Sequence, residues 1–281
     1  MAKAEFIKMH GCGNDYIYFN CFEQDIPDPE SLSIRLSDRR FGIGGDGIIL
    51  VCPSDVADAK MRMFNADGSE GKMCGNGIRC VAKLCHDEGI VKSDTIKIET
   101  LSGIKTIKLI KSGGEVIGAT VDMGKAETAP EKIPVLLKGE SVISRPVQIA
   151  GEQYCITCVS MGNPHCVVFA DNIDGLELEK IGPQFEKNAI FPEQVNTEFC
   201  EVISPTELKM RVWERGSGET WACGTGACAT VTAACLNGIS PKGEEILIHL
   251  RGGDLTIKYT DETVIMTGSA TEVFRGTVEI G

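Results

Sequence analysis

The 281-residue sequence predicts an α/β (α+β) protein of two pseudo-symmetric halves, each a mostly antiparallel, curled sheet around one apolar helix. Three observations predict it: an internal repeat, many short strand-like runs, and few helical patterns. Segments at a fixed offset of 149 positions (223 − 74 = 149) repeat a cysteine-glycine motif, a Gly-Asn pair and one polar residue: Cys74-Gly75-Asn76-Gly77 with Cys223-Gly224-Thr225-Gly226, Gly13-Asn14 with Gly162-Asn163, and Asn65 with Glu214. Self-similarity at a fixed offset favours two related halves.

Strands are expected wherever β-branched residues and alternation of apolar with polar residues coincide. In the first half these runs are Glu5–Met9, Tyr16–Asn20, Gly47–Val51, Lys60–Phe64 and Thr95–Ile110. In the second half they are Tyr154–Val159, Cys166–Phe169, Glu207–Trp213, Glu245–Leu250 and Thr263–Met266.

Helical periodicity occurs twice in each half. The predicted helices are Pro29–Arg40, Ile78–Glu88, Leu176–Lys187 and Gly226–Leu236. The last is apolar on most sides, as expected for a helix buried inside a sheet. In each half one helix thus begins just after the repeated cysteine.

We expect the first half to comprise residues 1–122 plus 266–281, and the second half residues 123–265. The segment 122–135 contains Gly124, Pro130 and Pro134, which favour a crossing between the halves. The strands after about Met266 are expected to return to the first half.

Composition narrows the function classes. The 28 basic and 40 acidic residues give a formal net charge of −12, without a basic stripe, which argues against nucleic-acid binding. No apolar run has the length of a membrane span, and the opening residues lack a signal-peptide core, so no membrane association is expected. Thirteen cysteines in a chain of this length without an export signal indicate reduced thiols and a cytoplasmic protein.

Glycines beside Cys74 and Cys223 let backbone N–H groups approach an anion, and a helix N-terminus favours negative charge. The same field favours a thiolate. A helix terminus contributes roughly 0.3–1 kcal/mol, up to ~2 when buried, and one pKa unit is about 1.36 kcal/mol. The dipole alone therefore predicts a pKa lowered by about one unit from ~8.5, which suits a thiol and thiolate acting as acid and base.

The alternative for these two cysteines is that they are packed structural thiols, and their shared offset argues against it. Cys155 and Cys158 have metal-type spacing but lie in a strand pattern with no second pair, which favours core packing. We therefore predict no metal site.

Six segments together resemble the diaminopimelate epimerase family, and the resemblance spans almost the whole chain. They are Lys8–Tyr16, Phe64–Glu70, Cys74–Cys80, Gly162–His165, Val195–Phe199 and Glu214–Gly226. The resemblance implies two halves, each a barrel-like sheet around a central helix, with the active site in the cleft between them. It also implies cofactor-independent epimerisation of LL-2,6-diaminopimelate to the meso isomer, in lysine and peptidoglycan precursor synthesis.

The resemblance assigns roles residue by residue. Cys74 and Cys223 are implied as acid and base on opposite faces of the α-carbon, and His165 and Glu214 as residues that modulate them. Backbone donors to the reacting carboxylate are implied at Gly75, Asn76, Gly224 and Thr225. Recognition of the distal amino-acid group is implied for Asn14, Asn65, Asn163, Asn196 and Arg215, with Glu214 contacting an ammonium. Family members are commonly homodimers, and Phe274 matches an aromatic position associated with that contact.

Three alternative functions predict residues that differ from those in this sequence. Proline or hydroxyproline racemases typically carry histidine after Cys-Gly, where this sequence has Asn76. A phenazine-pathway-like isomerase lacks one or both cysteines, whereas both are present here. A thiol-rich metal-storage protein would bind zinc tightly, but the cysteines are scattered and unpaired in the sequence.

Overall fold

The structure, a computed structural model, describes residues 2–280. The chain divides into two compact units, Met1–Asp122 with Thr267–Gly281 (unit 1) and Met123–Met266 (unit 2). Both boundaries fall inside strands, β8 (Glu115–Gly124) and β17 (Val264–Ser269). No helix among residues 2–280 is long and apolar enough to cross a membrane.

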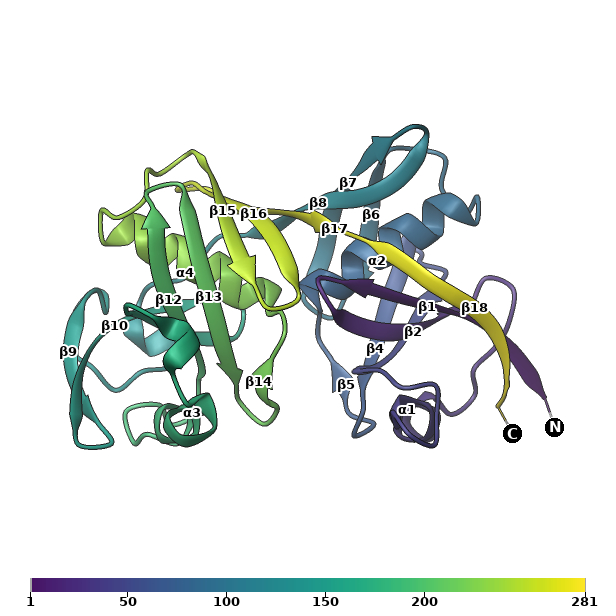
Figure 1. Cartoon of the computed structure of the whole chain (residues 1–281). Helices are drawn as coiled ribbons and strands as arrows, with labels where there is room; N and C mark the ends of the chain where they lie inside the picture. The colour runs from purple at the N-terminus through teal and green to yellow at the C-terminus, as the bar shows by residue number, and fades with distance from the viewer. Residues whose placement is uncertain (1, 281) are drawn as a thin grey trace. The chain divides into compact units, whose positions relative to one another are not determined.

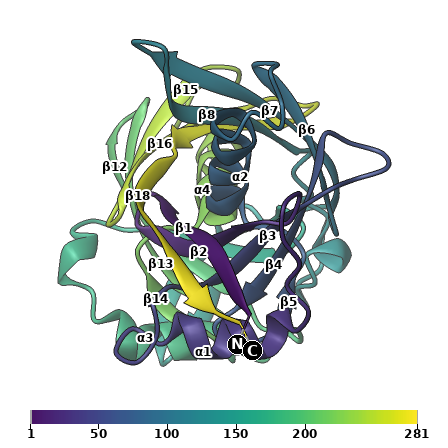
Figure 2. The same ribbon diagram turned by 90° about the vertical axis from the view of Figure 1, so that its right-hand side faces the viewer.

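Unit 1 is a sheet that returns to its starting strand. Its other elements are β1 (Lys3–Gly11), β2 (Asn14–Asn20), α1 (Pro29–Ser37), β3 (Gly47–Cys52), β4 (Ala59–Asn65), β5 (Glu70–Gly71), α2 (Gly75–Asp87), β6 (Thr95–Thr100), β7 (Gly103–Ser112) and β18 (Thr271–Glu279). Pairing runs from β18 through β1, β2, β3, β4, β6, β7 and β8 to β17. Because only Ala270 separates β17 from β18, the strands form a barrel-like ring, and Figure 2 shows α2 running inside it.

Unit 2 repeats this order. Its elements are η1 (Pro130–Lys132), β9 (Arg145–Ile149), β10 (Glu152–Ser160), β11 (Pro164–Phe169), η2 (Ile173–Gly175), α3 (Leu178–Glu186), β12 (Asn196–Ser204), β13 (Glu207–Glu214), β14 (Gly218–Thr220), α4 (Gly224–Leu236), β15 (Glu245–Leu250) and β16 (Gly253–Tyr259). Pairing runs β9, β10, β11, β12, β13, β15 and β16, with β14 on β13 (Figure 1).

The internal repeat extends to strand register. In unit 1 the parallel pair β2–β3 places Ile17 opposite Ile48, and unit 2 places Cys166 opposite Thr197, each 149 positions later. The antiparallel pair Met63–Gly71 recurs in the same way as Val212–Thr220. Since one residue of slip would reverse every side chain, equal registers give the two halves matching core faces. The predicted fold class of two mainly antiparallel, helix-centred halves is confirmed.

The central helices are buried on nearly every side. Ten of the thirteen residues of α2 are buried, and ten of the thirteen of α4. In α4 the small side chains Ala227, Ala229, Ala233 and Ala234 are fully buried, which lets strands close around the helix. A second core in unit 2 gathers Phe185, Phe199 and Trp213 beside α3.

Two of the predicted elements that differ in extent have a clear local cause. The first helix ends at Ser37 instead of Arg40, because Asp38 is extended and its carboxylate accepts the N–H groups of Arg40 and Phe41, at 2.7 and 2.8 Å. The predicted strand Thr95–Ile110 is two strands, β6 and β7. They are separated by a turn at Gly103 (φ +93°), where the Thr100 hydroxyl donates to the Gly103 carbonyl at 2.7 Å.

Candidate active site

Both repeated cysteines are the N-cap residues of the central helices. Cys74 and Cys223 have extended backbones, and each Sγ accepts the N–H of the glycine three residues later, at 3.3 Å. This is the capping geometry usually supplied by serine or aspartate. It puts each sulfur at the positive end of a helix.

Close packing favours glycine at the third residue of each central helix. A Cβ on Gly77 would lie 2.7 Å from Ile49 Cδ1, and a Cβ on Gly226 would lie 2.7 Å from Glu198 Oε1. The Cys-Gly-x-Gly motif therefore brings the helix start against a strand in each unit.

In unit 1 the thiol of half-buried Cys74 donates to Asn14 Oδ1 at 3.1 Å. Asn14 Nδ2 in turn donates to Asp46 Oδ2 at 2.7 Å, which fixes the orientation of the amide. Asn14 begins β2, so the sheet edge carries a polar partner to the sulfur on the helix.

A charged cluster supports Asn14 from behind. Asp15 contacts Lys8 Nζ at 2.5 Å and Arg39 Nη2 at 2.7 Å. Burial opposes the charge on Asp15, but these two cations lower the pKa of that carboxyl below its usual value. Burial, together with the Asp15 charge, raises the pKa of Asp46, which receives the Asn14 amide.

The side chains of Asn65 and Asn76 are held within unit 1. Asn65 Nδ2 donates to Ser69 Oγ at 3.0 Å in the turn after β4. Asn76 is buried, and its Oδ1 accepts from Arg79 Nη2 at 3.0 Å. Arg79, fully buried, also donates to the Gly75 carbonyl at 3.1 Å. Arg79 therefore holds the first turn of α2, so that the N–H groups of its first residues point out of the helix end.

In unit 2 a chain of polar contacts leads to Cys223. The Cys223 sulfur lies 3.4 Å from Thr225 Oγ1, which accepts from Asn163 Nδ2 at 3.3 Å. Asn163 Oδ1 lies 3.1 Å from His165 Nε2. His165 Nδ1 lies 2.7 Å from Glu198 Oε1, and neither side chain is exposed.

Glu198 has a second oxygen that is not satisfied. Its Oε2 is buried without a hydrogen-bond partner among the residues that the structure describes. A buried carboxylate with one bare oxygen is costly, and natural proteins keep such groups mainly at functional sites. Glu198 shares a strand face with Asn196, two positions earlier.

The pKa of Cys223 is raised, whereas the helix dipole alone predicts that it is lowered. Burial raises it well above the ordinary value for a thiol, and the charges of Glu214 and Glu198 raise it further. The hydrogen bonds from Thr225 and Gly226 lower it, but by less. The prediction of a lowered pKa is therefore wrong for Cys223.

Glu214 is a neighbour of the Cys223 thiol. Burial raises the pKa of Glu214, while hydrogen bonds from Thr220 and Cys223 and the charge of His165 act to lower it. Glu214 is the last residue of β13, and the Thr220 hydroxyl of β14 donates to its Oε1.

Arg215 follows Glu214 and is anchored by its backbone. Its N–H donates to Asn196 Oδ1 at 3.0 Å, and its guanidinium Nη1 donates to the Glu193 carbonyl at 2.8 Å. Asn196 is buried at the start of β12. Its side chain is therefore used to position Arg215.

The structure thus forms two groups of the predicted residues, one in each unit. Unit 1 joins Asn14 to Cys74, with Gly75 and Asn76 in the adjacent helix turn, and places Asn65 at the end of β4. Unit 2 joins the residues Asn163, His165, Thr225 and Cys223 in one chain, with Glu214 beside the thiol, Gly224 in the first turn of α4, and Asn196 against Arg215.

Four buried charged residues at these sites were not predicted from the sequence: Lys8, Arg79, Glu186 and Glu198. Arg79 stands in the first cysteine motif, where a charge inside an apolar helix is a usable signal. Glu198 stands in an otherwise uncharged run from Asn196 to Cys200, a similar signal. The sequence around Glu186 contains no comparable signal.

No group of three or more His, Cys, Asp or Glu side chains within residues 2–280 is arranged to hold a metal ion. Of the Cys155 and Cys158 pair, Cys158 is buried in the unit 2 core, whereas Cys155 is exposed.

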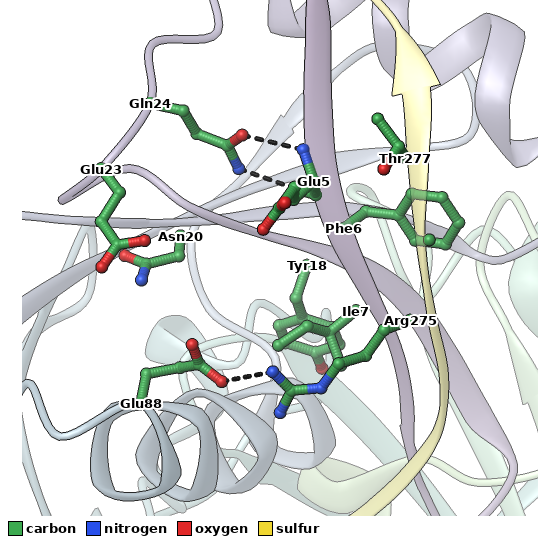
Figure 3. A pocket seen from close by; sticks show the side chains of 11 residues that line it. Glu5, Phe6, Ile7, Tyr18, Asn20, Glu23, Gln24, Glu88, Arg275 and Thr277 are labelled. Atoms are coloured by element: carbon green, nitrogen blue, oxygen red, sulfur yellow. Dashed lines mark hydrogen bonds and ion pairs between the residues drawn. The ribbon is translucent and has the colours of Figure 1, made fainter.

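A cavity of about 590 Å³ lies in unit 1, away from Cys74 (Figure 3). It is lined by residues of β1, β2 and β18 and by Glu88, whose carboxylate pairs with Arg275 at 2.6 Å. Glu88 caps the C-terminus of α2 and Cys74 its N-terminus. Thirteen helical residues span about 20 Å, so the cavity and the thiol lie at opposite ends of the helix.

Comparison with solved structures supports the fold. The chain superposes on a probable proline racemase from Agrobacterium radiobacter with a TM-score of 0.73 at 15% identity, covering 99% of this chain and 93% of that one. It superposes on a phenazine biosynthesis protein of the PhzF family from Bacillus anthracis with a TM-score of 0.69 at 16% identity, covering 99% and 100%. At such identities the likeness concerns the fold alone.

Sequence comparison identifies the family to which the chain belongs. The family model for diaminopimelate epimerase matches residues 6–129 and 157–273. A diaminopimelate epimerase from Agathobacter rectalis is 53% identical over 285 aligned positions, covering 98% of this chain and 99% of the relative. One from Methanococcus maripaludis is 51% identical, covering 98% and 100%. The chain belongs to the diaminopimelate epimerase family, as its cysteine, asparagine and glutamate motifs predict.

Proposed function

We propose that this protein interconverts LL-2,6-diaminopimelate and meso-diaminopimelate, the activity for which its family is named, and so supplies a precursor of lysine and peptidoglycan. The observation that carries the proposal is the pair of cysteine N-caps, Cys74 and Cys223, each at the start of a buried central helix. The family relationship supports the substrate.

In the proposed mechanism one thiolate removes the α-proton and the other thiol donates a proton to the opposite face. In one direction Cys223 accepts and Cys74 donates; in the reverse direction the roles exchange. The carboxylate of the reacting centre takes backbone N–H groups from Gly75 and Asn76 and from Gly224 and Thr225. These donors stabilise the charge that moves onto the carboxylate as the carbanion-like transition state forms.

The positive charge of the substrate ammonium should favour the thiolate form of Cys223. Burial raises the pKa of Cys223, and the charges of Glu214 and Glu198 raise it further. A substrate ammonium beside Glu214 would offset those carboxylates, because an opposite charge within a few ångströms favours the charged form of its neighbour. The thiolate then forms mainly when substrate is bound, and no bound cofactor is required for this chemistry.

Recognition of the distal amino-acid group is assigned to Asn14, Asn65, Asn163, Asn196 and Arg215. The guanidinium of Arg215 suits a carboxylate, and amide side chains serve both a carboxylate and an ammonium. His165 modulates the thiols through its contact with Asn163.

The test is deuterium incorporation at the α-carbon of LL-diaminopimelate in heavy water, without pyridoxal phosphate. The wild type should give the deuterated meso isomer, whereas Cys74→Ala and Cys223→Ala should each lose epimerisation by at least about 10³-fold, because each lacks one proton-transfer group. Cys155→Ala, which changes an exposed thiol of β10, should stay within about twofold. Exchange with proline but not with diaminopimelate would refute the substrate.

We further propose a homodimer in which Phe274 takes part. Phe274 and Val273 on β18 are 45% and 54% exposed, and Phe274 packs edge-on against Phe6 with ring centroids 5.8 Å apart. Exposed aromatic side chains on an ordered strand are typical of subunit contacts. Sedimentation velocity should give a dimer for the wild type and a monomer for Phe274→Asp; a Phe274→Asp dimer would refute this contact.

A cytoplasmic location is part of the proposal. It is supported by the thirteen cysteines, all of which are reduced in the structure. Such thiols persist in a reducing compartment.

A further inference from the structure

Glu186 is a buried carboxylate whose two oxygens serve the turn that carries Arg215. It is 6% exposed, at the last position of α3. Its Oε2 accepts the indole N–H of Trp213 at 2.7 Å, and its Oε1 accepts the backbone N–H of Gly216 at 3.0 Å. Both donors flank the pair Glu214-Arg215 in the sequence.

The position of Glu186 in its helix points to a role outside the helix. The C-terminus of a helix is its negative end, where an acidic side chain is disfavoured and a basic one is preferred. A buried carboxylate there is tolerated only if other groups satisfy it. The donors that do so come from β13 and the turn after it.

The helix is also shaped to receive the Trp213 ring. A Cβ on Gly182 would lie 2.3 Å from Trp213 Cδ2, so only glycine lets α3 approach the indole this closely. Gly182 and Glu186 are four residues apart and share one helix face. This face of α3 therefore packs against the indole ring at Gly182 and, one turn later, supplies the acceptor for the indole N–H.

The other backbone N–H groups of the turn after β13 are also hydrogen-bonded. Arg215 N–H is bound by Asn196, and Ser217 N–H donates to the Glu214 carbonyl at 3.1 Å. Gly216 has φ +77°, a conformation that glycine adopts without strain. Glu186 supplies the anchor at Gly216, between Arg215 and Ser217.

We propose that Glu186 is a positioning residue that fixes the turn after β13 and so holds the Arg215 guanidinium ready for the distal carboxylate of the substrate. The proposal rests on the proposed function, in which Arg215 recognises that carboxylate. Glu186 itself does not act on the reacting carbon. It acts through the backbone at Gly216 and through Trp213, and its loss should weaken substrate binding more than proton transfer.

Glu186→Gln tests this at nearly constant volume. An amide has one acceptor oxygen and an NH₂ group, so one of the two donors at the site must face another donor. We expect KM for diaminopimelate to rise about tenfold, with kcat within about threefold of the wild type. Trp213→Phe removes the indole donor together with part of the buried ring, but it leaves the Glu186 acceptor for the Gly216 N–H in place. It should raise KM by a smaller factor, and it also covers the case in which Glu186→Gln fails to fold.

The matched control is Glu201→Gln. Glu201, in β12 of the same unit, also accepts a backbone N–H, that of Ile173 at 3.2 Å. Among the described residues, its side chain forms no hydrogen bond or ion pair with the turn at residues 213–217. Its kinetic constants should stay within about twofold of the wild type.

Backbone hydrogen exchange separates this inference from the proposed function. The Gly216 amide should exchange faster in Glu186→Gln than in the wild type, whatever the substrate. Faster exchange with a raised KM supports the proposal. Unchanged KM, or a fall in kcat at constant KM, overturns it even if the melting temperature falls. If the wild type is inactive on diaminopimelate, the proposed function fails, and unchanged exchange at Gly216 would also overturn the anchor.

Discussion

At the scale of single residues, the sizes of the helix-dipole and burial effects decide the direction of the Cys223 pKa shift. A helix N-terminus is worth roughly 0.3–1 kcal/mol, up to ~2 when buried, which is about one pKa unit. Full burial can move a pKa by 3–5 units, and nearby carboxylates add to that for a thiol. The observed direction for Cys223, well above its usual value, follows burial, with Glu214 and Glu198 adding to it. The helix therefore stabilises the thiolate without determining its pKa.

This ordering predicts the effect of Glu214→Gln. Removing the negative charge removes a repulsion that disfavours the thiolate, so the pKa of Cys223 should fall. The rate of alkylation of Cys223 by iodoacetamide, followed by peptide mass spectrometry, should rise at a correspondingly lower pH than in the wild type.

The control for that measurement is Glu207→Gln. Glu207 begins the same strand, β13, and pairs with His249 at 2.9 Å, seven residues from Glu214. It is too far from Cys223 for a strong charge effect, since seven strand residues span about 23 Å. An alkylation midpoint in Glu214→Gln that equals that of the wild type, or exceeds it, would contradict the repulsion argument.

At the scale of elements, local signals identified the helices and many of the strands, and long-range pairing determined the rest. α2 and α4 begin at Gly75 and Gly224, slightly before the predicted starts, because the cysteines are N-caps. Strands after about Met266 are expected from the sequence, but no local pattern marks the bounds of β18. This strand alternates half-buried and exposed residues and forms by pairing with β1, from the opposite end of the chain.

The same distinction applies to the residues of the candidate site. The cysteines and their glycines are recognisable because a cap is made within four residues. Glu186 is recognisable only from Trp213 and Gly216, its partners 27–30 positions away. Glu198 has a local signal, but its contact with His165 spans 33 positions and is not evident from the sequence. A buried acid looks like any surface acid in a sequence until the strand or turn that satisfies it is placed.

At the scale of the whole molecule, unit 1 is discontinuous in sequence and unit 2 is continuous. Unit 1 needs the last strand: β18 pairs with β1 from Lys3–Glu279 to His10–Thr271. It also needs Ser269, whose carbonyl accepts the Nε–H of the buried Arg79 at 3.0 Å. Without these residues β1 loses one of its two neighbours, and a buried guanidinium loses an acceptor, which is strongly destabilising.

This asymmetry predicts how the chain can be divided. Residues 123–266 alone should unfold in one cooperative thermal transition by circular dichroism, because they contain a complete core and sheet. Residues 1–122 alone should not, whereas residues 267–281 joined through a short Gly-Ser linker to residues 1–122 should regain a cooperative transition. The linker is feasible because Lys3 and Glu279 are paired neighbours in adjacent strands. A cooperative transition for residues 1–122 alone would mean that β18 is dispensable, and its absence from the rearranged chain would mean that unit 1 depends on unit 2 to fold.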